Sequence, residues 1–225
     1  VITDEKSLPD VPKFNFDNII TVEPDISNIR ESQIWINKGR YQAYNLSPYD
    51  ETLLLDTDYM VNSNKLNTLF NLPTDFSCHD TTSFLMNPDA VQEVLSVYSF
   101  KTLWATVIMF KRSAKAEMIF DCMSMIKENW DHYRNLYRIP KKTYRNDFAL
   151  SIALGIVSGH TLKFDSIPWA MPSLLPTTEL SQVDTDSYQV RYHSKENQLK
   201  SLMFSGMDFH AMGKRHLEAV VASST

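Results

Sequence analysis

Short hydrophobic runs and amphipathic segments alternate along this chain. Hydrophobic runs of strand length at 53–55 and 103–110 predict two buried strands. Hydrophobic residues spaced three and four positions apart predict helices over 114–137 and 148–158. This alternation predicts an α/β fold, with a single domain over 1–225 and a mostly parallel central sheet flanked by helices.

Weaker patterns predict the remaining elements. They are strands at 1–4, 18–22 and 188–192, helices at 29–44, 66–70 and 87–98, and a proline-rich loop at 167–176. The chain opens on Val1 with a strand pattern and without an initiating Met. We therefore expect the sequence to be an N-terminally truncated version of a longer domain.

The composition is that of an ordinary globular protein, with 43% hydrophobic and 22% charged residues. A net charge of -5 argues against binding dominated by nonspecific attraction to nucleic acid or anionic membrane. The two cysteines, Cys78 and Cys122, cannot form a disulfide scaffold and indicate a reducing compartment. The run 103–110 is too short to span a bilayer and no signal peptide opens the chain, so we expect a soluble, cytoplasmic protein.

An acidic pair, Asp56 and Asp58, follows the leucine run directly. In a strand these two side chains point to the same side, where their carboxylates repel each other unless a cation lies between them. Oxygen ligands favour Mg²⁺ or Mn²⁺. The pair therefore predicts a metal site at a strand end, with two solvated acids in a loop as the alternative.

A second group of polar residues near the end of the sequence complements the acidic pair. His210, Gly213 and Lys214 lie within five positions. Glycine lets the backbone approach a ligand closely, and lysine supplies a point charge suited to phosphate. We expect this segment to fold over a diphosphate, with His210 as the third ligand of a cation held by Asp56 and Asp58; a solvated histidine near the end of the chain is the alternative.

The order of these motifs resembles that of the retaining glycosyltransferases of the glycogenin and galactosyltransferase-like family. Arg40 precedes the acidic pair, Asn146-Asp147 follows it, and His210-x-x-Gly213 comes last. The resemblance implies a GT-A fold, in which Asp56, Asp58 and His210 ligate Mn²⁺ (or Mg²⁺). It also implies that Arg40 contacts a UDP-sugar and that Asn146-Asp147 lies at the sugar.

The function implied by the resemblance is transfer of a hexosyl or pentosyl group from a nucleotide-sugar donor to an acceptor hydroxyl, with retention of configuration. Arg40, Asp56, Gly213 and Lys214 would bind the donor. Asp147 would act as nucleophile, as a stabiliser of the sugar cation or as a residue that positions hydroxyls; it also fits the first turn of a helix. A glycan, a protein, a small molecule or a modified nucleic acid are all open as acceptor.

The sequence departs from the family pattern at four places. The first strand of the family, which cradles the base, has no counterpart, and 104–106 read Trp-Ala-Thr where the family has Asn-Ala-Gly. Arg145 replaces the acid expected before the Gln-Asp pair. The closing Lys-Pro-Trp is missing, with His216 at the place of its lysine. These departures predict a divergent member.

Two other classes of protein are compatible with the acidic pair. Phosphatases of the haloacid dehalogenase type also place Asp-x-Asp after a hydrophobic strand, but they usually carry Thr or Val where this chain has Met60. A non-catalytic binding or structural protein on the same fold is the other alternative. The substitutions at Trp104 and Arg145 favour it, and the joint presence of Asp56, Asp58 and His210 speaks against it.

Overall fold

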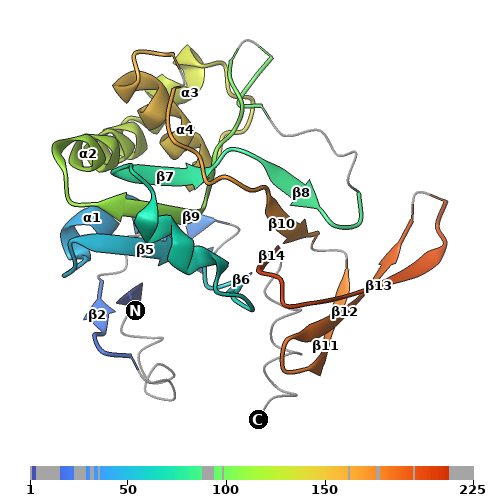
Figure 1. The fold of residues 1–225 in the computed structure, drawn as a ribbon. Coiled ribbons are helices and arrows are strands. Elements are labelled where there is room, and N and C mark those ends of the chain that lie inside the picture. Colours follow the sequence, from blue (N-terminus) through green and yellow to red (C-terminus); the bar gives the residue numbers. More distant parts are fainter. Residues whose placement is uncertain are drawn as a thin grey trace.

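The computed structural model describes residues 2–3, 16–22, 29–30, 33–34, 36–87, 94–97, 99–161, 163–175, 178–194 and 196–212. These residues form a mixed α/β structure (Figure 1). Gly213 and Lys214, together with most of the helix predicted at 87–98, lie outside the described residues.

The first sheet contains both strands that the hydrophobic runs predict. Its order is β5 (Glu51–Leu55), β9 (Trp104–Lys111) and β7 (Phe76–His79). Both neighbouring pairs are antiparallel, so the prediction of a mostly parallel central sheet is wrong for these strands. A continuous hydrophobic run such as that of β9 shows burial on both faces, and burial alone does not fix strand direction.

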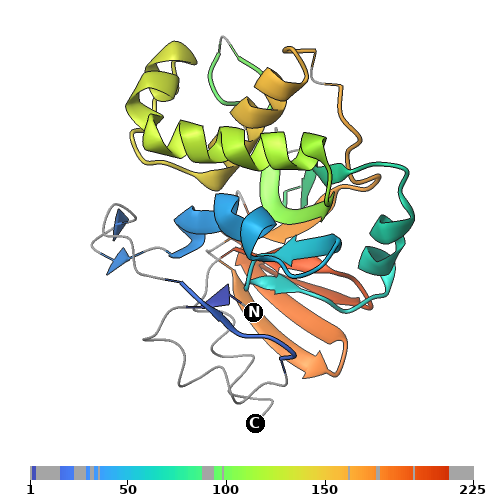
Figure 2. The same ribbon diagram turned by 90° about the vertical axis from the view of Figure 1, so that its left-hand side faces the viewer.

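Helices cover one face of the first sheet (Figures 1 and 2). They are α2 (Ala114–Glu128) and α4 (Asn146–Val157), and α3 (Trp130–Leu136) packs beside α2. The prediction of helix over 114–137 is confirmed except at Asn129, whose ψ of 35° ends α2. The helix predicted at 148–158 is confirmed and begins two residues earlier.

The helix-covered core lies between these helices and the first sheet. Aromatic rings dominate its centre, where the ring of Phe110 is 4.9 Å from that of Phe120 and 5.8 Å from that of Tyr44. Its large buried members are Tyr44, Phe76, Ile108, Phe110, Ile119, Phe120, Met123, Phe148, Leu150 and Leu154. The hydrophobic stripe of the helices therefore packs as core, as their periodicity predicts.

The second sheet has the order β6 (Tyr59–Met60), β14 (Phe209–Ala211), β10 (Met171–Leu174) and β8 (Thr82–Phe84). β10 is parallel to both of its neighbours, whereas β6 is antiparallel to β14. The loop predicted at 167–176 is therefore wrong over β10. Proline lacks an amide hydrogen, but β10 still pairs on both sides.

Side chains of the second sheet pack against both neighbouring layers. On one face, Tyr59 and Met171 join Val107 and Met109 of the first sheet in a shared core. On the other face, Phe209 packs with residues of the third sheet. The two sheets that supply the acidic pair and His210 are thus held together by a common hydrophobic layer.

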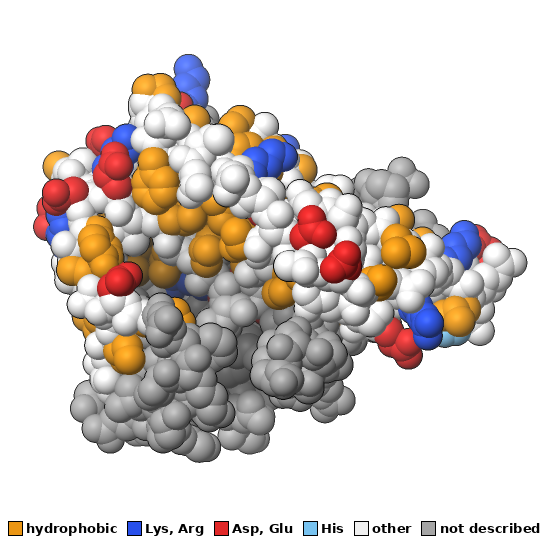
Figure 3. Space-filling view, turned by 60° about the horizontal axis from the view of Figure 1, so that its bottom comes forward, with side chains coloured by type: hydrophobic (Ala, Val, Ile, Leu, Met, Phe, Trp, Pro, Cys, Tyr) orange, Lys and Arg blue, Asp and Glu red, His pale blue; other side chains and the backbone are white. Residues whose placement is uncertain are grey.

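The third sheet consists of β11 (Glu179–Asp184), β12 (Ser187–His193) and β13 (Leu199–Ser205), all antiparallel. It confirms the strand predicted at 188–192. Figure 3 shows this sheet projecting from the body, with hydrophobic and charged side chains mixed on the visible face.

The remaining elements are short. They are β1 (Ile2–Thr3), β2 (Ile20–Thr21), β3 (Ile29–Arg30), β4 (Gln33–Ile34), the 3₁₀ helix η3 (Ile36–Gln42), α1 (Ala43–Leu46) and the 3₁₀ helix η4 (Lys65–Asn71). The helix predicted at 29–44 is wrong in its first part, where β3 and β4 pair antiparallel. Within the described part of the chain, no helix has the length and hydrophobicity needed to cross a bilayer.

Candidate metal centre

Strand pairing brings the acidic pair and His210 together. β6, which follows the acidic pair, lies antiparallel to β14, with Tyr59 opposite His210. The amide of Ala211 donates a hydrogen bond to the carbonyl oxygen of Asp58 at 2.9 Å. As a result, one side-chain ligand atom each of Asp56, Asp58 and His210 lies within 4.8 Å of the others.

A turn, and not strand alternation, holds the two carboxylates. β5 ends at Leu55, and the amide of Asp56 donates to the carbonyl oxygen of Thr106 at 2.9 Å. The amide of Tyr59 then donates back to the carbonyl oxygen of Asp56 at 3.1 Å. The prediction that the acids follow the strand is confirmed. The two carboxylates lie near each other because of this turn, and not because side chains alternate along a strand.

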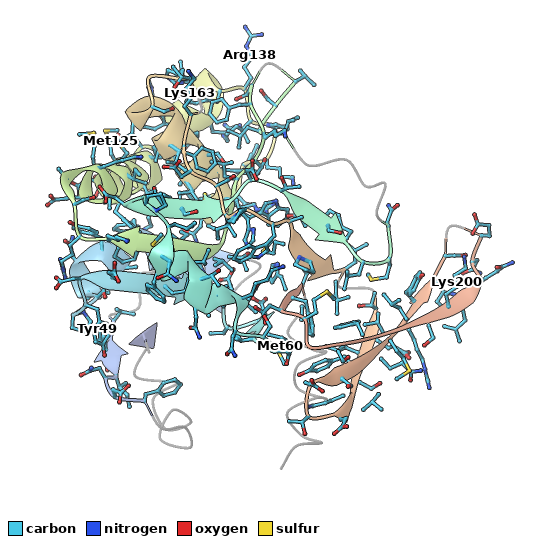
Figure 4. The ribbon with its side chains drawn as sticks, in the orientation of Figure 1. Tyr49, Met60, Met125, Arg138, Lys163 and Lys200 are labelled. Atoms are coloured by element: carbon cyan, nitrogen blue, oxygen red, sulfur yellow. The ribbon has the colours of Figure 1, made fainter. Side chains whose placement is uncertain are left out.

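Asp208 fixes the segment that carries His210, although the sequence analysis did not single it out. Its Oδ1 accepts hydrogen bonds from the amides of Asn62 and Ser63, both at 2.7 Å, and its Oδ2 accepts one from Ser63 Oγ at 2.9 Å. These bonds join the residues after β6 to the residue before β14. In Figure 4, Met60 marks β6 near the centre of the molecule, beside this junction.

Arg40 contacts the acidic pair directly. Its Nη2 forms an ion pair with Oδ1 of Asp56, and the Arg40 side chain is only 5% exposed. Arg40 lies in η3, which packs beside α2 and α4. The sequence analysis predicts that Arg40 binds the donor. In the structure, Arg40 lies beside the acidic pair because it forms an ion pair with Asp56.

Several charges act on the carboxyl group of Asp56. Burial raises its pKa, and the carboxylates of Asp58 and Asp147 raise it further, whereas Arg40 and His210 oppose the rise. The net pKa is raised, so Arg40 and His210 together do not fully compensate the burial and the neighbouring negative charge. A bound cation would supply the missing positive charge.

His210 faces Asp58. The distance from His210 Nε2 to Asp58 Oδ1 is 3.4 Å, and the two side chains are 9% and 19% exposed. The other ring nitrogen, Nδ1, is buried and has no hydrogen-bond partner among the described residues. Nε2 is therefore the ring nitrogen that lies at the acidic pair.

Asp147 belongs to the same electrostatic environment, because its carboxylate affects the pKa of Asp56. It lies in the first turn of α4, where its Oδ1 accepts from the amide of Ala105 at 2.9 Å and its Oδ2 from Arg145 Nη2 at 2.7 Å. Asn146 accepts a hydrogen bond from the hydroxyl of Tyr144 at 3.4 Å. Arg145 thus pairs with Asp147. The sequence analysis noted Arg145 only as a departure from the family pattern and did not predict this ion pair.

The donor set suits a hard divalent cation. Two carboxylates and an imidazole each bring one ligand atom to this place, and Arg40 pairs with Oδ1 of Asp56. Carboxylate oxygens bind Mg²⁺ and Mn²⁺, and the imidazole favours Mn²⁺ over Mg²⁺. Gly213 and Lys214, predicted to bind the donor, lie outside the described residues.

No family model, no curated protein and no solved structure matches this chain. The geometry of Asp56, Asp58 and His210 and the motif resemblance are therefore the two grounds for a functional proposal.

Proposed function

We propose that this protein is a metal-dependent glycosyltransferase that moves a sugar from a nucleotide-sugar, a UDP-sugar by resemblance, to an acceptor hydroxyl. The observation that carries the proposal is the convergence of Asp56, Asp58 and His210 within 4.8 Å. These residues come from a turn and from a strand far apart in the sequence. Burial and the neighbouring carboxylates disfavour the charged form of Asp56, as its raised pKa indicates, and a cation would favour that form.

A bound divalent cation would stabilise the negative charge that builds on the leaving diphosphate. The residues of the chain have separate tasks around it. Asp58 and His210 supply ligand atoms, and Arg40 orients Asp56 through their ion pair. Arg40 also adds a fixed positive charge at the place where a diphosphate would bind.

Asp147 would act on the sugar by position and charge. Both of its carboxylate oxygens already accept a hydrogen bond, from the amide of Ala105 and from Arg145. Such bonds orient a carboxylate and reduce its nucleophilicity. We therefore favour electrostatic stabilisation or hydroxyl positioning for Asp147 over direct attack on the sugar.

The phosphatase alternative receives less support. Its chemistry requires the first Asp as a nucleophile, but Asp56 is engaged by the buried Arg40. The non-catalytic alternative is separated from the proposal by experiment.

The test is hydrolysis of a panel of nucleotide-sugars by the purified chain, with Mn²⁺ and with a chelator. Asp58→Asn removes one ligand charge and keeps the shape of the side chain. Asp186→Asn is the matched control, because Asp186 belongs to the second Asp-x-Asp of the sequence and is exposed in the turn after β11. We expect Asp58→Asn to reduce Mn²⁺-dependent hydrolysis to the chelator level and Asp186→Asn to leave it unchanged.

Other outcomes overturn the proposal. Full activity of Asp58→Asn would remove the metal site from the reaction. Turnover of an aryl phosphate without turnover of any nucleotide-sugar would establish the phosphatase alternative. Mn²⁺ binding with neither activity would identify a non-catalytic metal-binding protein.

A further inference from the structure

Three buried polar side chains form a row across the second sheet. Tyr59 of β6 pairs in register with His210 of β14, and His210 pairs with Ser173 of β10. Residues that are opposite each other in neighbouring strands point to the same face of a sheet. Tyr59 packs into the layer shared with the first sheet, so the whole row faces that layer.

Each member of the row has a polar atom without a hydrogen-bond partner among the described residues. The atoms are the hydroxyl of Tyr59, Nδ1 of His210 and Oγ of Ser173. The residues are 6%, 7% and 0% exposed. Buried polar atoms in folded proteins are nearly always hydrogen-bonded, and a buried unpaired one costs about 1–3 kcal/mol.

A histidine that binds a metal through Nε2 carries its proton on Nδ1. That N–H group commonly donates to an oxygen, which fixes the tautomer and the orientation of the ring. We infer that Ser173 Oγ is this acceptor when His210 holds the cation, and that Ser173 is thereby a positioning residue for His210. The inference rests on the metal site of the proposed function.

The geometry of the strand pair favours Ser173 over Tyr59 for this role. Nδ1 is the ring nitrogen nearer the backbone, and a serine Oγ is one bond from its Cβ, so a rotation about Cα–Cβ can bring the two together across strands about 4.8 Å apart. The Tyr59 hydroxyl lies at the end of a long ring. Burial raises the Tyr59 pKa, and the carboxylate of Asp208 raises it further.

The test titrates Mn²⁺ alone into the full chain and measures its dissociation constant by calorimetry. Ser173→Ala removes the acceptor, and Ser77→Ala is its matched control. Both serines are fully buried with an unpaired Oγ, but Ser77 lies in β7 of the first sheet and has no strand pairing with β14. We expect Ser173→Ala to weaken Mn²⁺ binding roughly 10- to 100-fold and Ser77→Ala to leave it unchanged.

A spectroscopic measurement separates positioning from a general structural effect. Pulsed electron paramagnetic resonance of the Mn²⁺ complex detects the ¹⁴N coupling of a ligating imidazole. We expect this coupling in the wild type, its loss in His210→Ala, and an altered or heterogeneous coupling in Ser173→Ala. The midpoint temperature of thermal unfolding of the metal-free Ser173→Ala variant should equal or exceed that of the wild type, because the substitution removes an unpaired buried hydroxyl.

The outcomes distinguish the inference from the proposed function. Equal Mn²⁺ affinity and equal coupling in Ser173→Ala and Ser77→Ala would overturn the role of Ser173 and leave the metal site standing. Loss of affinity in Tyr59→Phe, with none in Ser173→Ala, would transfer the role to Tyr59 and also overturn the inference. Failure of the wild type to bind Mn²⁺ would overturn the metal site itself and everything that rests on it.

Discussion

The two faces of the first sheet differ in what they bury. The face under α2 and α4 carries Ile108 and Phe110 in the helix-covered core, where hydrophobic side chains fill the space. The opposite face, toward the second sheet, carries Val107 and Met109 but also Ser77 and His79. Three strands thus present a hydrophobic face and a mixed face.

Buried polar atoms that have no hydrogen-bond partner among the described residues concentrate on the mixed side. Ser77 Oγ and His79 Nε2 come from the first sheet, and Tyr59, Ser173 and His210 from the second. Hydrophobic packing on the helix-covered side stabilises the fold, whereas buried polar atoms without a partner reduce the stabilisation on the mixed side. This difference predicts that stability and metal binding respond to substitutions on different faces.

Phe110→Ala should have the largest effect on stability. Phe110 is fully buried and contacts the rings of Tyr44 and Phe120, so its truncation leaves a cavity and should lower the free energy of unfolding by about 5 kcal/mol. Urea unfolding measures this change. Mn²⁺ affinity of the protein that remains folded should be that of the wild type; its loss would show that the two faces are not independent.

Arg40→Met should lower the free energy of unfolding by about 3 to 4 kcal/mol, because it leaves the Asp56 carboxylate buried without its ion-pair partner. The deficit should shrink when Mn²⁺ is present, since the cation replaces the lost charge. Urea unfolding with and without Mn²⁺ tests this. Arg112→Met is the control, because Arg112 donates to the carbonyl oxygen of Ser47 and its deficit should not depend on Mn²⁺. If Arg40→Met lowered the free energy of unfolding equally with and without Mn²⁺, a cation at Asp56 would be contradicted.

His79 should make stability depend on pH. Burial lowers its pKa to about 4 from the ordinary 6.5, outweighing the bond between Nδ1 and the Trp169 carbonyl oxygen. Between these values the unfolded chain takes up a proton that the folded protein does not, so stability falls as the pH drops from 6.5 to 4, by about 3 kcal/mol in all. His79→Asn should flatten unfolding curves measured across this range, and an unchanged slope would contradict the assignment.

Substitution of two buried serines, one hydrogen-bonded and one without a partner among the described residues, should have the smallest effects on stability. Ser151 Oγ accepts from the amide of Leu103 at 2.7 Å and donates to the carbonyl oxygen of Asp147 at 2.6 Å. Ser151→Ala should therefore lower the free energy of unfolding by about 1–3 kcal/mol, whereas Ser77→Ala should change it by less than about 1 kcal/mol or raise it. Equal losses in thermal unfolding would show that Ser77 has a partner that stabilises the fold.

Local patterns predicted the elements and part of the site. The run at 53–55 predicted a strand, and the periodicity of 114–137 predicted helix. Both predictions succeeded because the residues that an element buries must be hydrophobic, so the spacing of hydrophobic residues follows the geometry of the element. Asn129 breaks the second segment with no change in hydrophobic spacing, so the break was not visible.

Long-range pairing was not predicted from the sequence. The antiparallel direction of β5 and β9, and the strand β10 within a proline-rich segment, depend on which segments meet and not on local composition. The residues around His210 predict a phosphate-binding segment, but it is the pairing of His210 with Tyr59 that brings it to Asp58. The position of Ser173 beside His210 could not be predicted from the sequence, because it follows only from the register of β10 and β14.

The most direct test of the central claim is calorimetric titration of Mn²⁺ into the wild type and Asp58→Asn. The wild type should bind Mn²⁺ stoichiometrically, and Asp58→Asn should lose this binding while both proteins remain folded. Absence of binding to the wild type, or equal affinity of the two proteins, would contradict the claim that Asp56, Asp58 and His210 hold a cation.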